Sequence, residues 1–194
     1  MEIIRPESRQ PLPPHAKRVF KGDIFDVYQW EQELFDGSTK TFDKVKRDDT
    51  IVVIPTLPGK KLLFLKDEQP ARSAIHTFPA GRMDKEGEGP LEAAQRELKE
   101  ETGYESDEWT LWKAYQPVTK IDWAVYVFIA RNCVRTTEPA LDPGERITVK
   151  EVTLDDVIAL VDDPDFLSED MKAELIAAKY DKASREVLET TIFG

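Results

Sequence analysis

The segment that most restricts the fold is the apolar run TIVVIPT at residues 50–56. It is rich in β-branched side chains, which favour strands, and its polar side chains stand only at the two ends. Such a run is typical of a strand that is buried on both faces. Pro58 and Gly59 then predict a turn into a second strand at residues 61–65. We therefore expect this part of the chain to belong to a sheet that is covered on both sides.

Other apolar segments predict the order of the remaining elements. Asp36, Gly37 and Ser38 lie between two strand-like stretches and indicate a hairpin. The further expected strands are at residues 24–34, 39–45, 110–115, 121–130 and 147–153, and the expected helices are at residues 90–102, 154–161 and 168–188. A chain that is mostly strand, with one helix in the middle and helices at the end, predicts an α+β fold with helices packed on a mixed sheet.

The first residues of the chain differ in composition from the rest. Residues 1–17 contain four prolines and few apolar side chains, so we expect an irregular arm there. The arm and the hairpin together form an N-terminal part at residues 1–46, and residues 47–194 form the second part with the C-terminal helices. A length of 194 residues fits one domain with such an appendage.

Composition narrows the class of protein. A hydrophobic content of 40% with 34% charged residues is typical of a soluble globular chain, and no run approaches the roughly 18–20 apolar residues of a membrane span. The single Cys133 suits a reducing compartment, and residues 1–18 lack an apolar signal core, so a cytoplasmic location is expected. A net charge of −11 argues against nucleic acid as a partner, although local cations can still bind a small phosphorylated substrate.

Residues 90–102 contain candidate metal-binding residues of the chain. Pro90 suits the first turn of a helix and Gly103 its end. Seen down the helix axis, Glu101 falls about 40° to one side of Glu97 and Glu100 about 60° to the other. Three carboxylates on one face repel one another, and a hard divalent cation is their natural counter-charge. On the helix pattern alone, a solvated acidic face is the more frequent alternative.

The surrounding residues resolve this choice. Gly81, Glu88 and the run Arg96-Glu97-Leu98-Lys99-Glu100-Glu101-Thr102-Gly103-Tyr104 resemble the Nudix box. Every interval from Glu88 to Tyr104 matches the family, whereas six residues rather than the family's five separate Gly81 from Glu88. This difference alters the loop before the helix and leaves the helix itself unchanged. The resemblance extends over residues 47–161.

The resemblance implies the Nudix fold, a mixed sheet between helices, and roles for individual residues. Glu97 and Glu101 correspond to the principal ligands of Mg²⁺ or Mn²⁺, and Glu100 to a further or water-mediated ligand. Arg96 corresponds to the residue that orients these carboxylates, and the carbonyl of Ala80 to an additional metal ligand. Glu88 corresponds to a support of the loop and helix.

A base is expected outside the box. Glu145 precedes an expected strand, at a place where ADP-ribose pyrophosphatases carry an acidic loop. The resemblance therefore implies that Glu145 is a metal ligand or the catalytic base. A solvated acid in a turn is the alternative for Glu145, and Asp142 is the second candidate.

Several segments are similar to the ADP-ribose and ADP-sugar pyrophosphatase branch of the family. They are the hairpin arm, Arg47 with Asp48, the Glu68-Gln69 pair followed by Arg72, and Pro79-Ala80-Gly81. In that branch the arm takes part in a homodimer and the arginines contact substrate, so Arg47 and Arg72 are candidate substrate contacts. Tyr28, Trp30 and Trp123 are candidates for stacking on a base, with packing as the more frequent role. Thr77, where the branch often has Glu, is a departure.

These features together predict an enzyme. We expect metal-dependent hydrolysis of the pyrophosphate bond of a nucleoside-diphosphate sugar, with ADP-ribose as the first candidate and AMP and a sugar phosphate as products. The alternatives are another nucleotide pyrophosphate, such as a GDP-sugar or a dinucleotide, and a Nudix module that binds a ligand without catalysis. The expected partners are the small-molecule substrate and a second copy of the chain.

Overall fold

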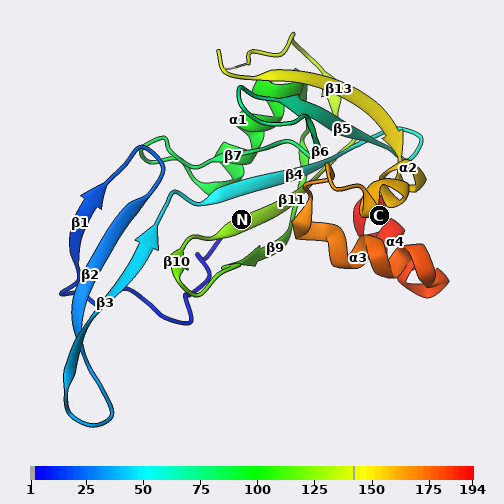
Figure 1. Cartoon of the computed structure of the whole chain (residues 1–194). Coiled ribbons are helices and arrows are strands. Elements are labelled where there is room, and N and C mark those ends of the chain that lie inside the picture. The colour runs from blue at the N-terminus through cyan, green and yellow to red at the C-terminus, as the bar shows by residue number, and fades with distance from the viewer. Residues whose placement is uncertain (1–2, 142) are drawn as a thin grey trace.

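The computed structural model describes residues 3–141 and 143–194, and its centre is a mixed seven-stranded sheet (Figure 1). The strand order is β13-β5-β4-β11-β9, with β6 added along β5 and β7 along β4. Strands β4 and β11 are parallel, and the other pairs are antiparallel. The strands are β4 (Thr50–Leu57), β5 (Lys61–Glu68), β6 (Ile75–Thr77), β7 (Ala80–Arg82), β9 (Glu108–Tyr115), β11 (Val125–Arg131) and β13 (Arg146–Thr153).

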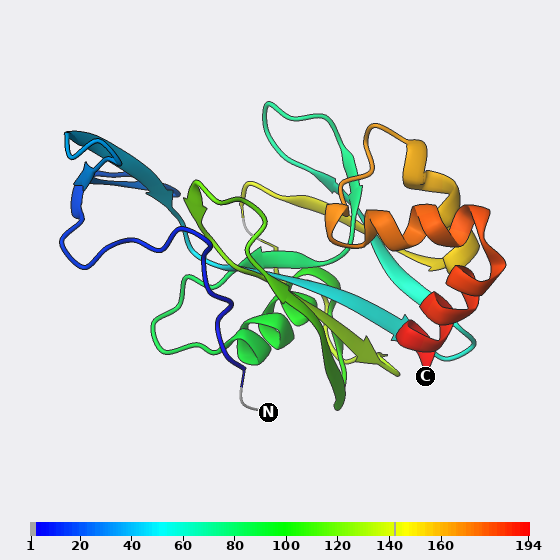
Figure 2. The same ribbon diagram turned by 90° about the horizontal axis from the view of Figure 1, so that it is seen from below.

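Strand β4 is buried on both faces, as the sequence predicts. Ile51 and Val53 join the apolar cluster that contains Leu98 of α1, whereas Val52 and Ile54 join the cluster formed with the C-terminal helices. The helices are α1 (Pro90–Thr102), α2 (Leu154–Ala159), α3 (Glu169–Tyr180) and α4 (Lys182–Phe193), with a 3₁₀ turn η1 (Leu160–Asp162) after α2. In Figure 2, α1 lies on one side of β4 and the pair α3 and α4 on the other. The α+β fold with a mixed sheet between helices is confirmed.

Strands β4 and β5 diverge along their length. Strands β4 and β5 pair only at Thr56 with Leu62 and at Leu57 with Lys61. Toward their other ends, β7 lies along β4 and β6 lies along β5. Strand β7 also contacts α1. The chain just before the helix is thereby held against the helix.

A second sheet forms the arm that projects from the body in Figure 1. Its strands are β1 (Lys17–Lys21), β2 (Asp26–Glu33), β3 (Thr39–Lys46) and β10 (Ile121–Asp122), in that order. The predicted hairpin is confirmed, since Leu34 N donates to Ser38 O at 2.7 Å and Asp36 Oδ1 accepts from Ser38 N at 2.9 Å. Strand β1, which the sequence pattern did not predict, pairs along β2.

The segment before β1 runs along the arm and the body. Residues 3–16 contain no helix or strand, as expected. Arg5 forms two hydrogen bonds to the carboxylate of Asp49, at 2.7 and 2.9 Å. The buried Lys44 of β3 donates to Ser8 Oγ at 2.6 Å. The segment therefore ties the arm to the central sheet.

Two expected elements are interrupted. Residues 121–130 form β10 in the arm and β11 in the central sheet, so one strand was the wrong prediction. Residues 168–188 fall in α3 and α4 rather than in one helix. The break is at Asp181, which has an extended backbone and caps α4, since its carboxylate accepts from Ser184 N at 2.7 Å. The apolar pattern of residues 168–188 continues across Asp181, so the sequence predicted one helix where the structure has two.

The remaining elements are short. Strands β8 (Tyr104–Glu105) and β12 (Val134–Arg135) form a two-stranded sheet just after α1. These strands complete the elements outside the two larger sheets.

The longest helix, α1, has 13 residues. Within the part of the chain that the structure describes, no helix has the length and apolar character to cross a membrane.

Candidate active site

Helix α1 begins and ends where the sequence predicts. Pro90 occupies the first turn, and the Glu92 carboxylate accepts a hydrogen bond from Gly89 N at 2.8 Å. At the other end Gly103 has φ 75°, a left-handed conformation that glycine adopts without strain, and its N–H donates to Lys99 O at 2.8 Å. These local signals fix the register of the helix, and with it the direction of each carboxylate.

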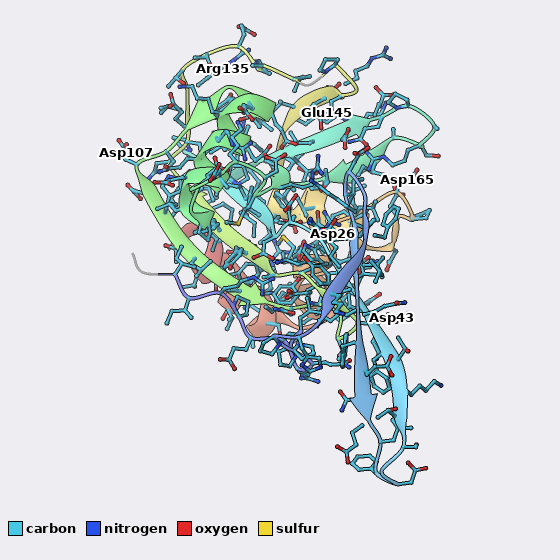
Figure 3. All side chains as sticks on the ribbon, turned by 90° about the vertical axis from the view of Figure 1, so that its left-hand side faces the viewer. Asp26, Asp43, Asp107, Arg135, Glu145 and Asp165 are labelled. Carbon is cyan, nitrogen blue, oxygen red and sulfur yellow. The ribbon has the colours of Figure 1, made fainter. Side chains whose placement is uncertain are left out.

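A cavity of about 430 Å³ lies between α1, β7 and the residues before β13. Most of the residues predicted for the site line it. They are Arg47, Ala80, Arg96, Glu97, Glu100, Glu101 and Glu145. Figure 3 labels Glu145 at the start of β13. Asp142, the second candidate for the base, lies outside the described residues. The structure thus brings residues from four distant parts of the sequence into one cavity.

Arg96 is the centre of an ion-pair network beside the cavity. Its guanidinium donates to both carboxylate oxygens of Glu88, at 2.7 and 2.9 Å. It also donates to Glu97 at 2.6 Å, to Glu100 at 3.1 Å and to the Arg82 carbonyl at 3.1 Å. The hydrogen bonds with Glu88 raise the pKa of Arg96 and lower the pKa of Glu88. Arg96 therefore contacts Glu97 and Glu100, two of the carboxylates that it is expected to orient.

The carboxylates deepest in the cavity are in an unfavourable position for negative charge. Burial raises the pKa of Glu101 well above its usual range, and the charges of Glu97, Glu145 and Asp67 add to this. Burial also raises the pKa of Glu97. A hydrogen bond that the Glu101 carboxylate accepts from Ala80 N at 3.0 Å opposes this rise in pKa. Buried carboxylates in such proximity require a positive counter-charge.

Gly81 is the residue of β7 that faces Glu97. A Cβ atom at position 81 would lie 2.0 Å from Glu97 Oε1 and 2.0 Å from its Cδ. A side chain there would displace the carboxylate. The glycine of the box is thus explained by close approach to a site residue.

The residues of the cavity fit a hard divalent cation. Glu97, Glu100, Glu101 and Glu145 offer carboxylate oxygens, the donors that Mg²⁺ and Mn²⁺ prefer. Within residues 3–141 and 143–194, no three acidic, histidine or cysteine side chains are already gathered as a metal-ligand group. Glu97 and Glu100 instead pair with Arg96. The oxygen donors and the raised pKa values of two of these acids support metal binding, and the ligand assignment stays a prediction.

Cationic side chains also line the cavity, and sequence reasoning missed two of them. Arg82 and Lys85 join the predicted Arg47 in the lining. The Arg47 guanidinium lies 4.7 Å from the ring centre of Trp123, and its buried Nε donates to no acceptor among the described residues. Burial, and next the charge of Arg82, lower the pKa of Arg47. Two guanidinium groups that repel each other in this way favour a bound anion.

The positions of Arg82 and Lys85 in the sequence are the only signal that could have identified them. Arg82 directly follows Gly81, and Lys85 lies in the loop that is one residue longer than the family pattern. Lys85 Nζ is 3.4 Å from a carboxylate oxygen of Glu100. Neither residue belongs to the box pattern, so the pattern did not identify them.

Two predicted substrate contacts lie outside this lining. Arg72, in the loop between β5 and β6, donates to Asp67 Oδ2 at 2.5 Å. Tyr28 lies in β2 of the arm, next to Gln29, which pairs with Asp43. Figure 3 labels Asp43 on the arm, away from Glu145. Within one chain, the structure therefore does not bring Tyr28 to the cavity.

The other aromatic candidates serve packing. Trp30 is 5% exposed and packs on Phe42, with ring centres 6.0 Å apart. Trp123 packs beneath Arg47, and its Nε1 donates to Thr50 Oγ1 at 2.9 Å. Both rings are thus occupied by neighbours within the chain.

Comparisons with known proteins give a consistent result. A family model described as NUDIX domain matches residues 46–173. The ADP-ribose pyrophosphatase of Bacillus subtilis (strain 168) is 34% identical over 149 residues, which are 75% of this chain and 80% of the relative. The methanol dehydrogenase activator of Bacillus methanolicus is 29% identical over 150 residues, with the same shares. A solved structure described as an ADP compounds hydrolase superposes with a TM-score of 0.70 over 95% of this chain and 97% of its own, at 22% identity, and so shares the fold.

Proposed function

This chain belongs to the NUDIX domain family, and from that premise we propose that it hydrolyses the pyrophosphate bond of a nucleoside-diphosphate sugar. ADP-ribose is the first candidate substrate, and AMP and ribose phosphate are then the products. One observation carries the proposal most directly. A single cavity is lined both by carboxylates of α1 and by Arg47 and Arg82.

The arginines and the carboxylates of the cavity suit the two needs of pyrophosphate hydrolysis, which are phosphate binding and activation of water. Arg47 and Arg82 bind and orient the phosphates, because planar guanidinium groups match phosphate oxygens. Glu97, Glu100 and Glu101 would hold Mg²⁺ or Mn²⁺, with Glu145 and the Ala80 carbonyl as further ligands. Such cations, when bound, neutralise phosphate charge and activate water for attack.

The protein's own residues have distinct roles in this proposal. Arg96 keeps Glu97 and Glu100 on the cavity side of α1 through the ion pairs described above. Glu145 is the proposed base, or a metal ligand, because it lines the same cavity as Glu97 and Glu101. A base beside the buried carboxylates can accept the proton of the attacking water.

The choice of ADP-ribose rests on similarity. The relative at 34% identity over 75% of this chain is described as an ADP-ribose pyrophosphatase. Arg47 and Arg82 would recognise phosphates, and they do not by themselves distinguish the nucleotide. GDP-sugars and dinucleotides therefore stay as alternatives.

A substrate panel tests the proposal. The protein would be incubated with Mg²⁺ and ADP-ribose, other ADP-sugars, GDP-sugars and dinucleotides, and the products would be separated by ion-exchange chromatography. The expected result is AMP from ADP-ribose at the highest kcat/KM. Turnover of another member only would reassign the substrate. Binding without turnover across the panel would favour the ligand-binding module.

We also propose that the arm, residues 1–46, mediates a homodimer while residues 47–194 form the catalytic part. Apolar side chains stand exposed on and beside β1, with exposed fractions of 53% for Val19, 56% for Phe20 and 48% for Ile24. A second copy of the chain would cover them. A sedimentation mass near the 22.2 kDa of one chain would contradict the homodimer.

A reducing, cytoplasmic location is proposed as well, and the buried Cys133, which forms no disulfide within the described residues, supports it.

A further inference from the structure

Two short stretches of chain join the sheet of the arm to the central sheet. The first is residues 47–49, between β3 and β4, and the second is residues 123–124, between β10 and β11. These two stretches form the junction. They lie side by side, since Ala124 N donates to Asp49 Oδ1 at 2.8 Å. The orientation of the arm on the body therefore depends on what holds the two stretches together.

Arg5, in the segment before β1, binds one carboxylate at each stretch of the junction. Its Nε donates to Asp49 Oδ2 at 2.7 Å, and its Nη2 donates to Asp49 Oδ1 at 2.9 Å. The same Nη2 also donates to Asp122 Oδ1 at 3.1 Å, directly before the second stretch. The two carboxylates are only 14% and 15% exposed, and such neighbouring like charges repel each other unless a cation lies between them. Arg5 supplies that cation, and the three residues together form the clasp.

The chain around Arg5 is fastened to both the body and the arm. The carbonyl of Pro6, the next residue, accepts from Gln116 Nε2 at 2.9 Å, just after β9 of the central sheet. Ser8 Oγ accepts from the buried Lys44 of β3. These contacts keep the backbone of Arg5 at the junction, so its side chain loses little further freedom when it binds both carboxylates.

Arg47 connects the junction with the proposed site. It lines the cavity of about 430 Å³ that holds the carboxylates of α1. It also lines a neighbouring cavity of about 350 Å³, together with the three residues of the clasp, Arg5, Asp49 and Asp122. The backbone N of Arg47 donates to Asp122 O at 3.3 Å, and its guanidinium packs on the ring of Trp123. A shift of Asp122 and Trp123 would therefore move Arg47 as well.

We propose that Arg5 is a positioning residue: the clasp fixes the arm on the body and so holds Arg47 at the cavity of the site. The effect on catalysis rests on the proposed function, because it assumes an anionic substrate next to Arg47. The alternative is that Arg5 forms ordinary surface ion pairs, which contribute little, and that the backbone alone fixes the junction.

Hydrogen exchange of backbone amides tests the clasp without any substrate. In Arg5→Gln, the amides of Arg47 and Ala124 should exchange at least about tenfold faster than in the wild type, because the junction opens more often. The amide of Val53, which donates to Pro79 O in the body, should keep its wild-type rate. A general loss of stability would instead raise the rates at all three positions.

Two further variants make the test specific. Arg185→Gln is the matched control, because Arg185 also pairs with two carboxylates, Asp155 at 2.6 Å and Glu189 at 3.2 Å, on helices away from the junction. Its exchange rates at the junction should equal those of the wild type. Arg5→Lys keeps the charge but lacks the planar guanidinium that reaches two carboxylates at once, so its rates should lie between those of the wild type and Arg5→Gln.

The position of Arg47 has two readouts of its own. The NMR signal of the Trp123 indole N–H, assigned by its loss in Trp123→Phe, should shift in Arg5→Gln because the guanidinium above the ring moves. KM for ADP-ribose should rise about fivefold in Arg5→Gln while kcat stays within about twofold, since substrate binding is weakened and the carboxylates of α1 are untouched. Arg185→Gln should leave the signal and KM as they are in the wild type.

The outcomes separate this inference from the proposed function. Wild-type exchange at the junction and an unshifted Trp123 signal in Arg5→Gln would overturn the clasp and leave the proposed function intact. Faster exchange with an unchanged KM would overturn the link between the clasp and Arg47. If the wild type hydrolysed no member of the substrate panel, the proposed function would fail, and the exchange rates and the Trp123 signal would still decide whether the clasp holds Arg47.

Discussion

Gly81 and Glu97 are in such close contact that a Cβ atom on residue 81 would lie 2.0 Å from a carboxylate oxygen of Glu97. The contact joins β7 to α1 at the centre of the proposed site. A substitution at Gly81 should therefore disturb the site without changing the apolar core.

We expect Gly81→Ala to lower kcat about 100-fold, because displacement of a site carboxylate by about 1 Å has an effect of that order. The melting temperature should fall only slightly, since the end of a glutamate side chain can move aside. Gly144→Ala is the matched control, because a Cβ atom there meets nothing within 4 Å. Rates and melting curves of both variants are the measurement. Wild-type kcat in Gly81→Ala would show that the position of Glu97 is not important for turnover.

Arg96 is expected to stabilise the fold as well as the site. Arg96→Gln should lower the free energy of unfolding by about 2–3 kcal/mol, since its partly buried partners Glu88 and Glu97 lose their counter-charge. Lys182→Gln is the control, because its pair with Glu186 is exposed and 3.7 Å long and contributes about 0–1 kcal/mol. Urea unfolding followed by tryptophan fluorescence measures both. Equal stability of the two variants would contradict the structural role of Arg96.

Arg82 is expected to bind substrate phosphate together with Arg47. Arg82→Gln should raise KM for ADP-ribose about tenfold, which corresponds to the loss of one charge-assisted hydrogen bond of about 1.5 kcal/mol. The difference from wild type should shrink as salt is added, because ions screen partly exposed charges. Lys61→Gln removes the same charge at a position paired with Glu151 and outside the cavity lining. If both variants showed the same KM, Arg82 would not be a substrate contact.

Cys133 should be chemically inert in the folded protein. Burial raises the pKa of its thiol to about 12, whereas an unfolded thiol has a pKa of about 8.5. The folded state therefore retains the proton longer, and stability from this group is present below about pH 8.5 and declines as pH rises toward 12. At pH 8, a thiol reagent should react only after denaturant is added. Rapid labelling of the native protein would contradict the buried position.

How much the sequence predicts depends on whether a signal is local. Helix α1 was predicted at its observed bounds because Pro90 and Gly103 mark both ends. The β2–β3 hairpin was predicted because the turn residues identify it. The cap at Asp181 was also local, but it lay inside an apolar pattern that continued on both sides and was overlooked.

The parts that escaped prediction depend on contacts between distant segments. Strand β7 has three residues and no pattern of its own, and pairing with β4 forms it. Arg82 enters the cavity only because of that pairing. The ion pair of Arg72 with Asp67 likewise depends on the fold of a loop, so the sequence pattern did not predict it.

The role of Glu101 in metal-dependent hydrolysis is tested by the rate of AMP release from ADP-ribose with Mg²⁺, compared between the wild type and Glu101→Gln. Glu101 is buried, and burial raises its pKa, so the neutral amide should fold at least as well. Glu105→Gln is the control, since Glu105 is paired with Lys99 at 3.0 Å outside the cavity lining. If Glu101 is a metal ligand, Glu101→Gln should lose at least about 100-fold in kcat while Glu105→Gln keeps the wild-type rate. Equal turnover by the wild type and Glu101→Gln would contradict this role.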